Sequence, residues 1–138
     1  MSVYKEIKTE FRNPQSLLAA LGDLDITIQT TGTRENTTKL ISHWHGNPPQ
    51  DVAIAINREQ ARRANLGDYD GLGFRWTGEG YAVVQDRIDE GNSRIIASMN
   101  KLKQRYAYHE VVRQAKAKGY TVQTVEEGGT LRLTLRAR

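Results

Sequence analysis

The stretch from Ile95 to Gly119 places its apolar residues at helical spacing on two different sides of one helix. At about 100° per residue, the main stripe consists of Ile95, Met99, Leu102, Tyr106 and His109. Tyr108, Val112 and Ala115 form a second stripe, which lies nearly opposite the first. A helix of this kind is either kinked where the stripes meet, near 106–109, or buried on two sides by a sheet, a loop or another subunit. The chain is therefore expected to fold around one long helix that is either kinked or packed along both sides.

Two tyrosines and a histidine lie where the stripes meet. Tyr106 and His109, on the main stripe, are expected to fill the core with their polar ends hydrogen-bonded. Tyr108 is expected to pack on the other side of the helix with Val112. Gly119 predicts the end of the helix through a left-handed backbone conformation.

Alternating apolar and polar residues predict strands before and after this helix. The stretches with this period are 3–11, 26–28, 39–45, 51–57, a hairpin over 72–85, and a closing hairpin that turns at Gly128 and Gly129. In the last strand the leucines at 131, 133 and 135 are expected to be buried and the arginines between them exposed. Asn13 and Pro14 predict the start of a short helix that ends near 22–25.

The predicted order is a strand, a short helix, several strands, a long helix and a final hairpin. This order favours the α+β class, with a mostly antiparallel sheet that carries one short N-terminal helix and one long helix on one face. A chain of 138 residues has about the size of one globular domain, and no linker or low-complexity run divides it. We therefore expect a single domain over 1–138, closed by a β-hairpin.

The absence of cysteine excludes disulfides, thiolate catalysis and cysteine-ligated metal sites, and it favours a cytoplasmic location. No apolar run approaches the roughly 18 residues of a membrane span. The net charge of +4 is uneven, because 1–92 holds 10 Lys and Arg against 13 Asp and Glu, or −3, whereas 93–138 holds 10 against 3, or +7. A basic last third points to an acidic or nucleic-acid partner, or to no more than a solvated surface.

His43 and His45, two residues apart in a predicted strand, could offer two imidazoles to one metal ion. No third ligand is evident in the sequence, so we expect no metal site and no cofactor. Calcium-loop, dinucleotide, phosphate-loop and serine-elbow patterns are incomplete or absent. Asp68, Asp70 and Glu79 remain as candidates for acid–base catalysis, although turns are rich in acidic residues for conformational reasons. These patterns predict a protein that is not an enzyme.

Four stretches of the chain resemble one known family. They read IKTEF near the start, YDGLGFRW before an acidic turn, QRYAYHEV in the long helix, and GYTVQTVEEGGTLRL at the end. On these strings the chain is similar to domain of unknown function 1257, the hypothetical chloroplast reading frame 35 family, over almost its whole length. The segment 32–63 matches less well, and HWHG within it is not typical of the family. The resemblance implies a cyanobacterial, plastid or cyanophage setting and supplies no catalytic residue.

Two functions follow as hypotheses. The first is a non-enzymatic adaptor that docks on a protein partner or forms a homo-oligomer through the helix 101–118, with contacts at Tyr108, Val112 and Ala115. The alternative is a nucleic-acid-binding module whose basic last third contacts phosphates. Its candidate residues are Lys101, Lys103, Arg105, Lys116, Lys118, Arg132 and Arg136.

Overall fold

The computed structural model describes residues 4–26, 28, 30–44 and 46–137. Its elements follow in the order β1 (Tyr4–Phe11), α1 (Pro14–Asp23), β2 (Thr30–Thr31), β3 (Thr38–Leu40), β4 (Gln50–Val52), β5 (Ile54–Ile56), α2 (Arg58–Arg63), β6 (Leu72–Trp76), β7 (Tyr81–Asp86), α3 (Ser93–Ala117), β8 (Tyr120–Glu127) and β9 (Thr130–Ala137). The α+β class with antiparallel sheets, a long helix and a closing hairpin is confirmed. In the described part of the chain, no helix is both long enough and apolar enough to cross a membrane.

The largest sheet has five strands in the order β1-β7-β6-β5-β2, and each neighbouring pair is antiparallel. β6 and β7 form the predicted hairpin, in which Phe74 lies opposite Val83. The face that carries these two residues packs against α1, α2 and α3 and encloses the main core. The largest fully buried side chains there include Phe11, Phe74, Leu17, Leu21 and Leu102.

The opposite face of the sheet is covered by a small antiparallel sheet of β3 and β4. Leu40 and Val52 of this layer are buried in one cluster with Val84 of β7. Gly73 of β6 permits the close approach, because a Cβ atom there would lie 2.7 Å from Cγ1 of Val52. The body therefore has three layers: β3–β4, the five-stranded sheet and the helices.

Local sequence signals fix the ends of the helices. Asn13 caps α1 by accepting the backbone N–H of Ser16 at 3.0 Å, as predicted. Gly119, with a φ of 87°, adopts the left-handed conformation that follows α3. Asn57 caps α2 in the same way as Asn13 caps α1, and α2 is a helix that the sequence analysis did not predict.

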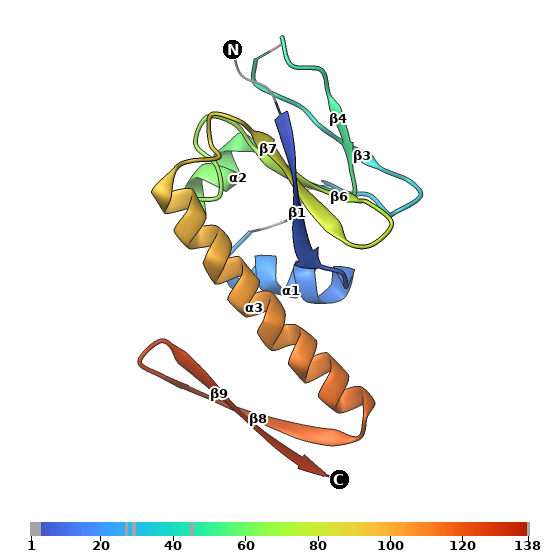
Figure 1. Cartoon of the computed structure of the whole chain (residues 1–138), viewed down its shortest axis with the longest axis vertical. Helices are drawn as coiled ribbons and strands as arrows, with labels where there is room; N and C mark the ends of the chain where they lie inside the picture. Colours follow the sequence, from blue (N-terminus) through green and yellow to red (C-terminus); the bar gives the residue numbers. More distant parts are fainter. Residues whose placement is uncertain (1–3, 27, 29, 45, 138) are drawn as a thin grey trace.

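α3 runs across the body and continues past α1 (Figure 1). Its main stripe is buried at Ile95, Leu102 and Tyr106, as the helical spacing predicted. Beyond α1, the last turns of α3 carry the hairpin of β8 and β9, which lies apart from the body in Figure 1. We call residues 108–117 of α3 together with β8 and β9 the arm. The helix is continuous from Ser93 to Ala117, so its two stripes are explained by burial on two sides.

The structure corrects three predicted strands. In the stretch 26–28, neither Ile26 nor Ile28 lies in a strand, and β2 begins only at Thr30. Within 39–45 the strand ends at Leu40, and Ser42 Oγ then accepts the backbone N–H of Trp44 at 3.0 Å and turns the chain. The stretch 51–57 is two strands, because β4 ends at Val52 in the small sheet and β5 begins at Ile54 in the large one. Val3, Thr27 and His45, which belong to predicted strands, lie outside the described residues.

Candidate functional site

The hairpin of β8 and β9 turns one apolar face toward α3. Its register pairs Val122 with Leu135, Thr124 with Leu133 and Glu126 with Leu131, so these six residues share a face. Thr124 contacts Tyr108, and Leu131 and Leu133 line a groove beside α3, which fixes the orientation of that face. The opposite face is polar and carries Thr121, Gln123, Val125, Glu127, Thr130, Arg132, Thr134 and Arg136.

The second stripe of α3 receives the hairpin. Tyr108 Oη lies 2.9 Å from Thr124 Oγ1, and the guanidinium of Arg105 lies 4.7 Å from the centre of the Tyr108 ring. Ala115 is buried and Val112 is half-buried. The residues predicted to contact a partner therefore lie on the side of α3 that the protein's own hairpin partly covers.

The cover is incomplete, and a groove of about 820 Å³ remains between α3 and the hairpin. The side chains that line this groove include Lys101, Ala107, Tyr108, Val111, Leu131 and Leu133. Val111 is 43% exposed and Leu135 is 46% exposed, although both are large apolar side chains. The prediction that the three leucines of the last strand are buried is therefore wrong: Leu131 and Leu133 are half-buried and Leu135 is exposed, because α3 covers only part of the hairpin face.

Tyr106 and His109 fasten α3 to the body. The Tyr106 hydroxyl accepts the backbone N–H groups of Arg12 and Asn13 at 2.8 and 2.9 Å. His109 Nε2 lies 2.7 Å from a carboxylate oxygen of Asp23 in α1. The expectation that both side chains fill the core with bonded polar ends is confirmed for Tyr106. His109 has its polar end bonded as expected, but it is half-buried and lies outside the core.

Asp23 is also bonded to Arg105, whose Nε lies 2.6 Å from the same oxygen. Burial raises the pKa of Asp23, but the hydrogen bonds of His109 and Arg105 outweigh burial and lower the pKa below its usual value. The carboxylate thus stays charged and holds two side chains of α3 against the end of α1.

Glu110 makes the second link between α3 and α1. It accepts the hydroxyl of Ser16 at 2.6 Å and the Nε–H of Arg113 at 2.9 Å. The hydrogen bond of Arg113 lowers the pKa of Glu110 to about 2, although burial acts in the opposite direction. Glu110 therefore remains an ionised acceptor at every physiological pH.

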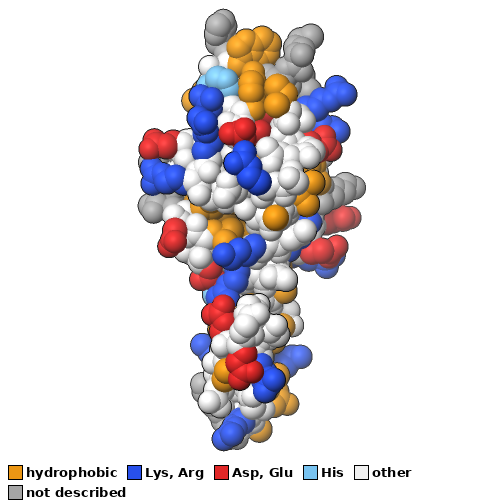
Figure 2. All heavy atoms as spheres, turned by 90° about the vertical axis from the view of Figure 1, so that its left-hand side faces the viewer, with side chains coloured by type: hydrophobic (Ala, Val, Ile, Leu, Met, Phe, Trp, Pro, Cys, Tyr) orange, Lys and Arg blue, Asp and Glu red, His pale blue; other side chains and the backbone are white. Residues whose placement is uncertain are grey.

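The basic residues of the nucleic-acid alternative do not form one patch. Arg105 is paired with Asp23, and Arg132 lies 3.8 Å from Glu127. Among the described residues, no ion pair is found for Lys101, Lys103, Lys116, Lys118 and Arg136. Figure 2 shows acidic and basic side chains interleaved along the arm on the face that it presents. The charge excess of the last third is thus spread out and partly neutralised.

A buried polar cluster holds the loop 41–49 at the other end of the body. Ser42 Oγ donates a hydrogen bond to Asp70, which is 1% exposed, and His43 Nδ1 lies 3.5 Å from the same carboxylate. Asp70 also accepts the backbone N–H of Gly71 at 3.0 Å. In a catalytic triad the serine is bonded to the imidazole, whereas here both side chains face the carboxylate. The cluster does not build an activated nucleophile.

Asn47 extends the cluster to a second carboxylate. Its amide lies 3.4 Å from Ser42 Oγ and 3.3 Å from Asp86, which is fully buried. The buried hydroxyl of Tyr4 has no hydrogen-bond partner in the described structure. Burial raises the pKa of Tyr4 well above its usual value, and the negative charge of Asp70 adds to the shift.

The metal and acid–base candidates from the sequence form no common site, although His43 lies beside Asp70. His43 lies in a bend rather than a strand, because the strand ends at Leu40, and His45 lies outside the described residues. Among the residues that the structure describes, no three His, Asp or Glu side chains are grouped to hold a metal ion. Asp70 is buried, whereas Asp68 and Glu79 are exposed. Asp68 lies in the loop before β6 and Glu79 in the turn after it, at opposite ends of that strand.

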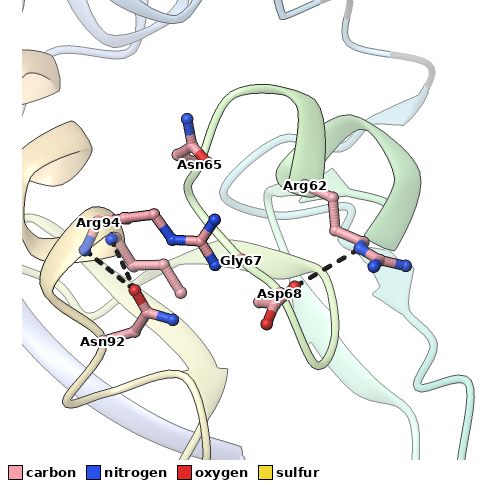
Figure 3. A pocket seen from close by; sticks show the side chains of 7 residues that line it. Arg62, Asn65, Gly67, Asp68, Asn92 and Arg94 are labelled. Atoms are coloured by element: carbon pink, nitrogen blue, oxygen red, sulfur yellow. Dashed lines mark hydrogen bonds and ion pairs between the residues drawn. The ribbon is translucent and has the colours of Figure 1, made fainter.

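Asp68 lies at a small polar pocket next to the start of α3 (Figure 3). Its Oδ1 lies 3.6 Å from Nε of Arg62, and Arg94 reaches toward the pocket from the other side. Asn92 Oδ1 accepts the backbone N–H groups of Arg94 and Ile95 at 3.0 and 3.4 Å. Because Asn92 uses the first N–H groups of α3 and Asp68 adds negative charge, the pocket is not arranged for a phosphate.

Asp89, which is 2% exposed, is not among the residues that the sequence indicated. Its carboxylate accepts the backbone N–H groups of Asp68, Tyr69 and Asp70 at 3.2, 2.8 and 3.2 Å. An aspartate after a strand is a signal for a turn, but it does not show that the carboxylate binds a loop about twenty residues earlier. Only the tertiary structure brings the carboxylate of Asp89 to the loop 68–70.

Comparison with known proteins gives a family but no activity. Residues 20–134 match the family described as "Protein of unknown function (DUF1257)", and this range includes the segment 32–63. The "Uncharacterized protein ycf35" of Guillardia theta is 29% identical over 143 residues, which cover 98% of this chain and 96% of that protein. No solved structure matches the chain.

Proposed function

This chain belongs to the DUF1257 family, and we propose that it is a non-enzymatic interaction protein whose arm docks on a protein partner. The observation that carries the proposal is the hairpin of β8 and β9, which stands apart from the body and pairs with no other strand in the described part of the chain. A two-stranded sheet alone is marginally stable in water and gains stability when further surface covers it. α3 supplies only part of that cover.

Apolar surface on the arm supports the same proposal. Val111, Val125 and Leu135 are each at least 40% exposed. Val111 lines the groove, and Leu135 lies on the face of the hairpin that is turned toward α3. Single exposed apolar residues are ordinary, but a groove lined by Tyr108, Val111 and two leucines is a concave apolar surface. Aromatic and aliphatic side chains around such a groove are the usual anchors of protein interfaces.

The proposal assigns no catalysis to the protein. Ser42, His43 and Asp70 are not in the order of a nucleophile and its base. Among the described residues, the groove between α3 and the hairpin is lined by no His or Asp, and Glu126 is its one acidic residue. We place the protein in the cytoplasm in this proposal, since it has no cysteine.

Site-specific photo-cross-linking tests the function. A photoreactive amino acid replaces Val111 on the arm or, as a matched control, Ile88 on the body, which is 54% exposed. Irradiation of the purified protein, alone and in extract of cells that contain it naturally, should give discrete cross-linked products from position 111 and none from position 88. The substitutions Val111→Glu and Ile88→Glu, both at exposed positions, should leave the melting temperature nearly unchanged.

Binding that survives Val111→Glu but is abolished by Ile88→Glu would contradict the proposal. The same conclusion would follow if position 111 gave no cross-link under any condition. Cross-links identified by mass spectrometry as the same partner residues in repeated experiments distinguish a specific interface from random collision.

Nucleic-acid binding is the second candidate, favoured by one observation. Arg132 and Arg136 share the outward face of the hairpin with uncharged Gln123 and Thr134. Fluorescence anisotropy with random single-stranded oligonucleotides across a salt series tests this candidate. Phosphate contacts require that affinity fall steeply with salt, and Arg136→Ala should reduce the salt slope by about one. Affinity that is absent or independent of salt contradicts it.

A further inference from the structure

We propose that the body binds a small amphipathic acid that contains an amide group, in a pocket between the sheet and the first half of α3. Residues from β1, β7, the loop after β7 and α3 before residue 104 line the pocket. It is separate from the arm, so the inference goes beyond the proposed function and does not depend on it. The pocket volume is about 240 Å³, which is room for roughly eight water-sized groups at about 30 Å³ each.

Much of the pocket wall is apolar. Ile7 of β1 and Val83 of β7, which lie opposite each other in the sheet, line it from one side. Ile95, Ile96 and Met99 line it from α3. Ile96 is 51% exposed and Met99 is half-buried, so α3 leaves this strip of the sheet partly open. Apolar walls around a few polar groups are typical of small-molecule sites.

Gln85 is a polar exception on the covered face of β7. Successive side chains of a strand alternate between faces, so Tyr81, Val83 and Gln85 share the face that packs against the helices. The first two belong to the main core, and Gln85 is only 6% exposed. Its side chain lines the pocket and has no hydrogen-bond partner among the described residues. A buried carboxamide without a partner destabilises a fold, which points to a ligand that supplies the missing bonds.

The carboxamide of Gln85 specifies the polar group of that ligand. A glutamine side chain ends in a C=O acceptor and an NH₂ donor. An amide presents the complementary N–H and C=O, whereas an alkyl chain presents neither. A ligand without such a pair leaves Gln85 unsatisfied and is expected to bind more weakly.

The charges at the pocket favour an acidic ligand. Lys103 lines the pocket, and no ion pair of Lys103 is found among the described residues. Two carboxylates also line it, but both are engaged elsewhere. Asp89 accepts the backbone N–H groups of 68–70, and Glu90 is paired with Lys5 at 3.0 Å. A carboxylate on the ligand can therefore pair with Lys103.

The methyl group of Met99 provides a direct reporter of the pocket. The chain has two methionines, and carbon-13 labelling of their methyl groups followed by Met99→Leu identifies the NMR signal of Met99. The probes are three molecules of equal length. Hippurate has a phenyl ring, an amide and a carboxylate. 4-Phenylbutyrate has methylene groups in place of the amide, and hippuramide lacks the negative charge.

Hippurate should shift the Met99 signal with a dissociation constant on the order of 1 mM, as expected for a probe of this size. 4-Phenylbutyrate should bind about tenfold more weakly and hippuramide about threefold more weakly. Gln85→Met should remove the advantage of hippurate over 4-phenylbutyrate, and Lys103→Met should remove its advantage over hippuramide. Lys101→Met, at an exposed lysine of α3 outside the pocket, is the matched control and should change neither ratio.

A Met99 signal that none of the probes shifts, at about ten times the expected dissociation constant, overturns the inference. Equal affinity for hippurate and 4-phenylbutyrate also overturns it, as does a Gln85→Met variant that weakens both probes alike. Melting temperatures verify that each variant is folded. If Gln85→Met does not fold, the comparison of the three probes on the unsubstituted chain still decides the question. None of these outcomes bears on cross-linking at position 111, so the role of the arm is tested separately.

Discussion

Tyr106 and Tyr108, two positions apart on α3, are bonded to opposite parts of the molecule. The hydroxyl of Tyr106 accepts two backbone N–H groups of the body, at 2.8 and 2.9 Å, while that of Tyr108 lies 2.9 Å from Thr124 of the hairpin. One helix thus serves two packing surfaces without a kink. The two hydroxyls therefore separate the stability of the body from the attachment of the hairpin.

Tyr106→Phe should destabilise the protein more than Tyr108→Phe. The first substitution leaves the N–H groups of Arg12 and Asn13 without their acceptor in a partly buried place, at a cost of about 1–3 kcal/mol. The second removes one exposed hydrogen bond, at a cost of about 0.5 kcal/mol. Urea unfolding measures both free energies. Equal losses would show that the Tyr106 hydroxyl does not stabilise the body in this way.

Ala115→Glu should release the hairpin and leave the body folded. Ala115 is 6% exposed on the arm and does not belong to the main core, so a buried carboxylate there disrupts the contact of α3 with β8. Hydrogen exchange should show lost protection over 120–137 and retained protection in β6 and β7. Ala117→Glu, at an exposed position two residues later, is the matched control and should leave the hairpin protected. Loss of protection throughout the body would contradict this separation.

Glu110 should make stability depend on pH in the acid range. Its pKa in the folded chain is about 2, below the usual value of roughly 4.3. Because the folded pKa is depressed, the stabilisation is fully present above the usual pKa and is lost as pH falls from there toward 2. Thermal unfolding between these limits should show a shallower decline for Glu110→Gln than for the unsubstituted chain. If stability fell equally with pH in Glu110→Gln and in the unsubstituted chain, this role would be ruled out. Glu79→Gln, at an exposed turn, is the control.

Tyr4→Phe should not destabilise the protein at neutral pH. Its buried hydroxyl makes no hydrogen bond of ordinary geometry among the described residues, although Ser42 and Asp70 lie close to it, so the substitution removes a poorly compensated polar group. The raised folded pKa of Tyr4 means that stability is present below the usual value of about 10 and is lost as pH rises above it. The variant should therefore resist alkaline unfolding better than the original chain. A clear loss of melting temperature at pH 7 would indicate that the hydroxyl is bonded after all.

Local patterns were sufficient for most elements but not for the region 39–66. The hairpin of β6 and β7 was predicted because both strands alternate and a turn joins them, and these are properties of neighbouring residues. The strand at 39–45 was overextended because Ile41 continues the alternation, yet Ile41 is 70% exposed and Ser42 turns the chain toward Asp70. Ser42 and Asp70 are 28 residues apart in the sequence, so a local pattern could not predict the hydrogen bond that competes with continuation of the strand.

The sequence by itself determined the two stripes of α3, the caps at Asn13 and Gly119, and the alternation of leucine and arginine in β9, since helical and strand periods depend only on local geometry. Only the tertiary structure decided what covers each stripe: α1 and the large sheet bury the first, and the hairpin partly covers the second. It also decided that Leu135 and Val111 remain exposed, because the covered area depends on the width of a helix laid against a wider hairpin.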